Sequence, residues 1–114
     1  MNHAEIARAF SNGDFERTYA FISDTAVWTV IGESKFVGKQ AIIDNCEKVA
    51  SYFKSVDTDF RTLNVIADEN KVAIEGTAAF TRDGKQVSFV SACDVYEFSN
   101  QGLIESIRSY CIQS

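Results

Sequence analysis

The sequence predicts an α+β domain in which a cone-shaped, curved antiparallel sheet wraps around three N-terminal helices. Apolar residues recur mostly at helical spacing as far as residue 54, whereas the pattern from residue 57 onward has period two. Short polar turns separate the period-two segments, so consecutive strands run antiparallel and do not form a βαβ repeat. A sheet this long on 114 residues must curl, and we expect a cone whose wide end stays open.

The first half of the chain supplies the helices and one strand. The expected elements are, in order, a helix at 3–11, a short helix after Asp14, a strand at 25–31, a loop at 33–37 and a helix at 39–54. Asn12-Gly13 ends the first helix, and Asp14 caps the second. The strand is β-branched and aromatic, and Gly32 follows it.

The second half of the chain supplies the rest of the sheet. Alternating segments predict strands near 57–67, 71–81, 86–98 and 103–112. The chain contains no proline, internal repeat, low-complexity segment or linker. Residues 1–114 are therefore expected to form a single domain.

Composition and charge exclude several classes of function. The net charge is -5, and the charges along the sequence form no basic face. Neither nucleic acid nor an anionic membrane is therefore expected as a partner. No segment has the pattern of a signal peptide or of a membrane helix. The three cysteines lack the spacing of metal ligands and indicate reduced thiols. We therefore expect a cytoplasmic protein. The one histidine, His3, argues against histidine triads and multi-histidine metal sites. We expect no metal and no cofactor, because no phosphate loop or nucleotide fingerprint is present.

Asp94 is the chemically unusual residue of the chain. It stands among β-branched, aromatic and small residues, where burial of an unpaired charge would be costly. If Asp94 points inward, alternation turns Ala92 and Tyr96 inward with it. On the last strand, alternation places Ile107, Ser109 and Cys111 on one face and Ile104, Arg108, Tyr110 and Ile112 on the other. Both faces are thus partly apolar, which predicts a homodimer through the sheet.

Four segments resemble a known superfamily in their order and spacing. They are Asn12-Gly13-Asp14, the strand residues 24–28, residues 36–42, and residues 94–98 followed by Gly102-Leu103-Ile104 with Arg108 and Tyr110. Over nearly the full length the chain resembles the nuclear transport factor two-like (cystatin-like) superfamily, in its SnoaL-like and ketosteroid-isomerase-like branch. The resemblance implies a cone-shaped α+β barrel, frequent homodimers, and a pocket that isomerases, polyketide cyclases, epoxide hydrolases, dehydratases and binding domains all use.

When the catalytic residues of three branches of this superfamily are placed on the sequence one by one, Asp94 is the only position that keeps the residue type of the family. Against the ketosteroid isomerases, the general-base aspartate falls on Thr29 and the oxyanion-hole tyrosine on Ile6, while the protonated aspartic acid falls on Asp94. Against the limonene epoxide hydrolases, the last-strand aspartate falls on Ser109, and the arginine and second aspartate fall near Gly76 and Ala78. Asp94 also matches the acid/base aspartate of the SnoaL-type cyclases.

Two functions stay open from the sequence. The first is an enzyme of isomerase, cyclase or dehydratase type that uses Asp94 as acid/base on a small apolar organic ligand. The second is a non-catalytic ligand-binding or dimeric assembly domain, favoured by the absence of a base at Thr29 and of a second donor at Ile6. For Asp94 itself the structural alternative is a strand aspartate paired with a basic group or a backbone amide. The expected pocket residues are Trp28, Thr29, Tyr52, Ala92, Ile107 and Ser109, although alternation lets only one of Trp28 and Thr29 face inward.

Overall fold

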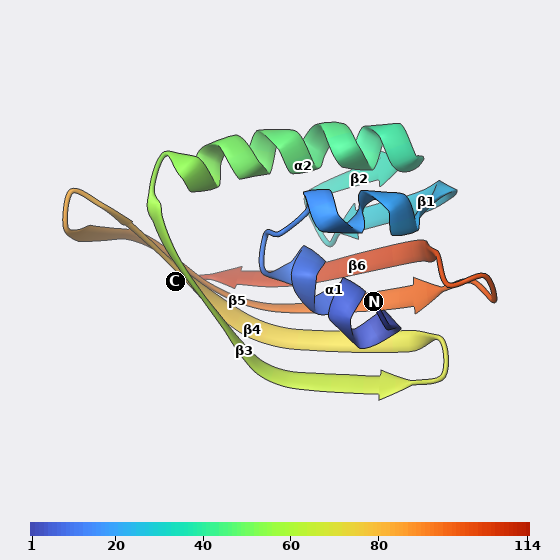
Figure 1. Cartoon of the computed structure of the whole chain (residues 1–114). Helices are drawn as coiled ribbons and strands as arrows, with labels where there is room; N and C mark the ends of the chain where they lie inside the picture. Colours follow the sequence, from blue (N-terminus) through green and yellow to red (C-terminus); the bar gives the residue numbers. More distant parts are fainter.

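The computed structural model describes residues 1–114 and has a curved six-stranded sheet, not closed, with helices on one face (Figure 1). The elements are α1 (His3–Ser11), the 3-10 helix η1 (Glu16–Phe21), β1 (Ile22–Val30), β2 (Ser34–Val37), α2 (Lys39–Lys54), β3 (Asp57–Asp68), β4 (Lys71–Arg82), β5 (Lys85–Phe98) and β6 (Ile104–Gln113). The predicted α+β fold class is confirmed.

The sheet order is β2-β1-β6-β5-β4-β3. Strands β3 to β6 form an antiparallel meander, as their short turns predict. The first strand, β1, pairs in parallel with β6, and β2 pairs antiparallel with the outer edge of β1. Within the sheet, β6 is therefore the only strand of the meander that pairs with an N-terminal strand.

Three local predictions were wrong. Asp14, expected to cap the second helix, is not its N-cap, because Phe15 holds that position and the Asp14 carboxylate pairs with Arg17. Residues 33–37, expected as a loop, contain strand β2, whose four residues are too short for a period-two pattern to be recognised. Ile104 was placed on the outer face, but it is fully buried. The β5–β6 register pairs Glu97 with Ser106 and then Phe98 with Ile104, so Glu105 is an extra residue. This irregularity reverses the alternation and turns Ile104 inward beside Phe98.

Local signals explain how α1 begins and ends. The Asn2 side chain accepts a hydrogen bond from the Glu5 backbone N–H at 2.8 Å, and Glu5 accepts one from the Asn2 backbone N–H at 3.0 Å, which is a capping box. At the other end Gly13 adopts a φ of 79°, and a Cβ there would lie 2.9 Å from the Phe53 ring. Only glycine fits this close turn without strain.

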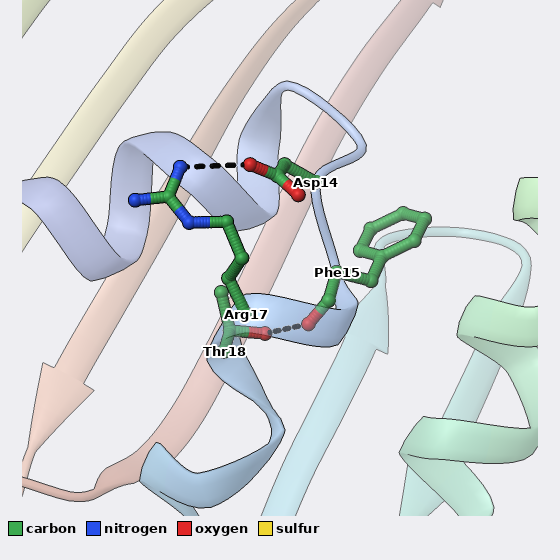
Figure 2. A network of polar contacts seen from close by, with 4 residues as sticks. All are labelled: Asp14, Phe15, Arg17 and Thr18. Atoms are coloured by element: carbon green, nitrogen blue, oxygen red, sulfur yellow. Dashed lines mark hydrogen bonds and ion pairs between the residues drawn. The ribbon is translucent and has the colours of Figure 1, made fainter.

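The turn after α1 directs an aromatic ring toward the interior. Figure 2 shows the exposed ion pair of Asp14 and Arg17, with 2.8 Å between Oδ2 and Nη1, on the side away from the Phe15 ring. The buried Thr18 hydroxyl donates a 2.6 Å hydrogen bond to the Phe15 carbonyl. This bond fixes the first turn of η1, so that the Phe15 ring packs under Phe10, with ring centroids 5.0 Å apart.

The hydrophobic core lies between the helices and the concave face of the sheet. Helix α1 contributes Ile6 and Phe10, and α2 contributes Ile42 and Cys46, all at most 3% exposed. The Phe10 ring meets Trp28 of β1 edge to face at a centroid distance of 5.0 Å. The core fills the space at the α1 end of the sheet, and a cavity stays open beside it.

Candidate functional site

A cavity of about 250 Å³ lies between α1, α2 and the concave face of the sheet. Six of the 13 apolar residues that line it are aromatic, namely Phe10, Phe15, Trp28, Phe53, Phe60 and Phe80. Its polar groups are Ser11, Asn12, Asn45, Thr77, Asp94 and Ser109. An apolar cavity of about 150 Å³ can bind benzene, so this volume admits a molecule of roughly ten non-hydrogen atoms.

Asp94 is the carboxylic acid of this cavity. It stands on β5, with Ile74 of β4 and Ser109 of β6 as its neighbours in register. Burial raises the pKa of the Asp94 carboxyl above its usual range, and hydrogen bonding from the Ser109 and Ser11 hydroxyls opposes part of that rise. A carboxyl with a raised pKa holds its proton closer to neutral pH, which suits an acid/base group.

Two serines connect Asp94 to two aromatic side chains. The Ser11 hydroxyl donates to Asp94 Oδ2 at 2.8 Å, and the same Ser11 oxygen lies 2.6 Å from the Tyr96 hydroxyl. On the other side, the Trp28 indole N–H donates to Ser109 Oγ at 3.0 Å. Residues of α1, β1, β5 and β6 thus converge on one carboxyl group.

Asp94 is the only carboxyl group that lines the cavity, and no histidine lines it. Cys111 lines it, but burial and the charge of Asp94 raise the pKa of the Cys111 thiol, which therefore stays protonated and is a weak nucleophile. Burial also raises the pKa of Cys46, to about 12, in the core beneath α2. No group of three or more histidine, cysteine, aspartate or glutamate side chains is arranged to hold a metal ion.

The structure brings four of the seven predicted site residues to the cavity and leaves three outside its lining. Asp94, Trp28, Ala92 and Ser109 line the cavity, whereas Thr29, Tyr52 and Ile107 do not. Alternation on β1 turns Trp28 inward, so Thr29 points to the other face. Tyr52 is 43% exposed and packs on the Phe80 ring from outside. Ile107 is fully buried in the core, in register with Tyr96.

Sequence reasoning missed the polar partners of Asp94. Ser11 is the last residue of α1, a position where a serine ordinarily indicates no more than a helix end, and it meets Asp94 only through the fold. Tyr96 was expected to face inward, but its hydrogen bond with Ser11 has no sequence signal. Asn45 lines the cavity from α2 and was not predicted either.

No helix of the chain is both long and apolar enough to cross a lipid bilayer.

The curved sheet, the covering helices and the cavity beneath them define a protein of the nuclear transport factor 2-like class. Residues 4–107 match the family model of the SnoaL-like domain, and the chain belongs to this family. No protein with a curated function matches its sequence.

Solved structures agree with this family. A nuclear transport factor 2-like protein of unknown function from Cytophaga hutchinsonii is 40% identical, with a TM-score of 0.87 and 96% of each chain covered. An epoxide hydrolase of M. tuberculosis, described as LEH-like, is 22% identical, with a TM-score of 0.72 over 96% of this chain and 82% of that one. A putative SnoaL-like polyketide cyclase from Jannaschia is 13% identical, with a TM-score of 0.73 over 96% and 84%. At these two lower identities the likeness extends to the fold alone.

Proposed function

We propose that this protein is an acid/base enzyme of isomerase, cyclase or dehydratase type, which acts on a small, mainly apolar organic molecule that carries an oxygen. The observation that supports this is one carboxyl group, Asp94, in an apolar cavity, with its pKa raised by burial. In a dry cavity Asp94 exchanges a proton with the ligand more effectively than an exposed carboxylate would, because its pKa is closer to neutral pH.

The apolar wall of the cavity determines which ligands fit beside Asp94. Six aromatic rings surround the space, so flat or cyclic hydrocarbon groups fit better than charged ones. The volume favours ketones and acyl compounds of about ten non-hydrogen atoms over larger lipids. Epoxide hydrolysis is not proposed, because the resemblance to the limonene epoxide hydrolases places the reacting residues of that branch at Ser109 and near Gly76 and Ala78, and none of these three residues is ionisable.

A non-catalytic ligand-binding domain is the second candidate. The observation that favours it is the lack of a partner for Asp94 in proton transfer: Thr29 faces away from the cavity and Ile6 lies in the core. Proton transfer at carbon ordinarily uses a separate base and an oxyanion donor. In this case the same cavity holds the ligand and Asp94 only orients it.

Dimerisation through the outer face of the sheet belongs to the same proposal. Leu63, Tyr110 and Ile112 are 57%, 46% and 72% exposed and line a shallow depression on the face opposite the helices. A second copy of the chain would remove this apolar surface from water. We expect a dimer mass in sedimentation equilibrium and dissociation by Ile112→Asp; a single-chain mass at micromolar concentration would contradict the dimer.

A cytoplasmic location is part of the proposal as well. Cys46, Cys93 and Cys111 are all free thiols, which suits a reducing compartment. Fractionation of the native host cells would test this location.

Thermal-shift screening with small ketones, acyl compounds and steroids tests the ligand site. A compound that raises the melting temperature of the wild-type protein should lose most of its effect on Asp94→Leu, which has nearly the same shape but no polar group. Asp57→Leu, at an exposed aspartate at the start of β3, is the matched control and should respond like the wild type. If Asp94→Leu keeps the full response, Asp94 does not act on the ligand. Turnover of a bound compound would distinguish the enzyme from the binding domain.

A further inference from the structure

We infer that Tyr96 and Trp28 are positioning residues that make the hydroxyls of Ser11 and Ser109 donate to Asp94, so that the proton of a neutral Asp94 points into the cavity. This inference rests on the proposed function and narrows it. The ligand must then present a hydrogen-bond acceptor, such as a carbonyl oxygen, to Asp94.

The direction of the Trp28–Ser109 bond is fixed by chemistry. An indole N–H can donate but cannot accept, so Ser109 Oγ is the acceptor of the 3.0 Å bond from Trp28. Ser109 is buried, with only 5% of the residue exposed, and its hydroxyl keeps its own proton for another acceptor. Asp94 is its direct neighbour in the β5–β6 register. The Ser109 proton therefore points to the Asp94 carboxyl.

The direction of the Ser11–Tyr96 bond follows from burial. Tyr96 is fully buried, and the Ser11 oxygen, 2.6 Å away, is the only partner of its hydroxyl. If Tyr96 donates to Ser11 and Ser11 donates to Asp94, every proton has an acceptor. The opposite direction leaves the phenolic proton of Tyr96 without an acceptor in the core, which is unfavourable.

Both serines therefore donate to Asp94 in either of its ionisation states. In the ionised form, the two donated hydrogen bonds stabilise the carboxylate. In the neutral form, neither serine oxygen is free to accept the proton of Asp94, so this proton can donate to the ligand. The titratable neighbours do not disturb this arrangement. The Asp94 charge acts on Tyr96, Cys93 and Cys111, and burial raises the pKa of all three groups, so they stay neutral.

The sign of a pKa change reveals the direction of each bond. Ser11→Ala should raise the pKa of Asp94, because the carboxylate loses a hydrogen-bond donor. This pKa is measured by carbon-13 NMR of the carboxyl group as a function of pH. A fall would mean that Ser11 accepts from the neutral acid, and would overturn the inference. Tyr96→Phe should also raise this pKa, because it frees Ser11 to accept from Asp94. Tyr52→Phe is the matched control, since Tyr52 is outside the network, and should leave the pKa unchanged.

A shape-matched pair of probes tests the consequence for the ligand. Acetophenone and α-methylstyrene differ in one position, where a carbonyl oxygen replaces a methylene group. Below the pKa of Asp94, acetophenone should bind more tightly, and Tyr96→Phe should reduce this preference about fivefold, the effect of one hydrogen bond. The Tyr52→Phe variant should keep the preference.

The outcomes separate this inference from the proposed function. Asp94→Leu, which has nearly the shape of the acid but no hydrogen-bond donor, removes the proposed contact to the ligand. If Asp94→Leu abolishes the preference for acetophenone while Ser11→Ala and Tyr96→Phe leave the pKa and the preference unchanged, the ligand site stands and the positioning role is refuted. If Asp94→Leu keeps the preference, the proposed function is refuted, and the NMR titration of the ligand-free protein still decides the bond directions. Should Tyr96→Phe not fold, Ser11→Ala alone gives the sign.

Discussion

Filling the cavity should stabilise the protein and block its ligand site. Ala78 of β4 lines the cavity and is 9% exposed, so the three carbons added by Ala78→Leu enter open space. They occupy about 80 Å³, a third of the 250 Å³ present, and about 24 cal/mol per Å³ of cavity removed gives about 2 kcal/mol. Side-chain strain against Phe60 and Phe80 reduces this gain, and we expect about 1–2 kcal/mol.

The assay is urea denaturation of Ala78→Leu beside Ala79→Leu. Ala79 is the next residue on β4 and points to the opposite face, so the control adds the same group without entering the cavity. Ala78→Leu should raise the free energy of unfolding and remove the thermal response to every ligand that binds the wild type. A loss of more than about 1 kcal/mol relative to Ala79→Leu, with ligand response intact, would show that this space is not open.

Three further predictions concern the site and its supports. Burial raises the pKa of Asp94 in the folded state above its usual value of 3.8, so the folded state binds the proton more tightly than the unfolded state. Proton binding therefore stabilises the fold at low pH, and this stabilisation is lost as the pH rises through the pKa of the folded state. The free energy of unfolding of the wild type relative to Asp94→Asn should therefore fall over that range in urea titrations, and parallel pH curves would contradict it. Gly76→Ala would place a Cβ 2.6 Å from the Arg61 carbonyl oxygen and should lose about 2 kcal/mol in chemical denaturation. An unchanged free energy of unfolding would show that β3 moves freely. Asn2→Ala breaks the capping box and should cost about 1 kcal/mol in thermal unfolding, and an unchanged melting temperature would show that the first turn of α1 does not contribute.

The sequence predicted the parts of this structure that depend on local pattern. Steps of three and four residues predicted α2, and alternation predicted the long strands, because both signals repeat over many residues. Alternation also put Asp94, Ala92 and Tyr96 on one face, and Asp94 and Ala92 both line the cavity. These features require no knowledge of distant contacts.

The remaining features depend on contacts between distant residues. Ile104 was misplaced because the extra residue Glu105 changes the alternation, and nothing in its local sequence marks the irregularity. Ser11 and Asp94 are 83 positions apart, and their hydrogen bond exists only because α1 lies over β5. Ile107 and Tyr52 are apolar or aromatic residues of the right elements, but whether such a residue fills the core or lines a space is decided by packing.

The pairing of β1 with β6 has a consequence for how the protein folds. The partners in this ladder, such as Trp28 and Ile107, are separated by roughly eighty residues, and contacts so distant in sequence slow folding because the chain must first lose the entropy of a large loop. The meander of β3 to β6 has short connections and can form earlier. We therefore expect the ring of Trp28 to become ordered late in refolding, so that its fluorescence lags behind the appearance of β-structure in stopped-flow circular dichroism.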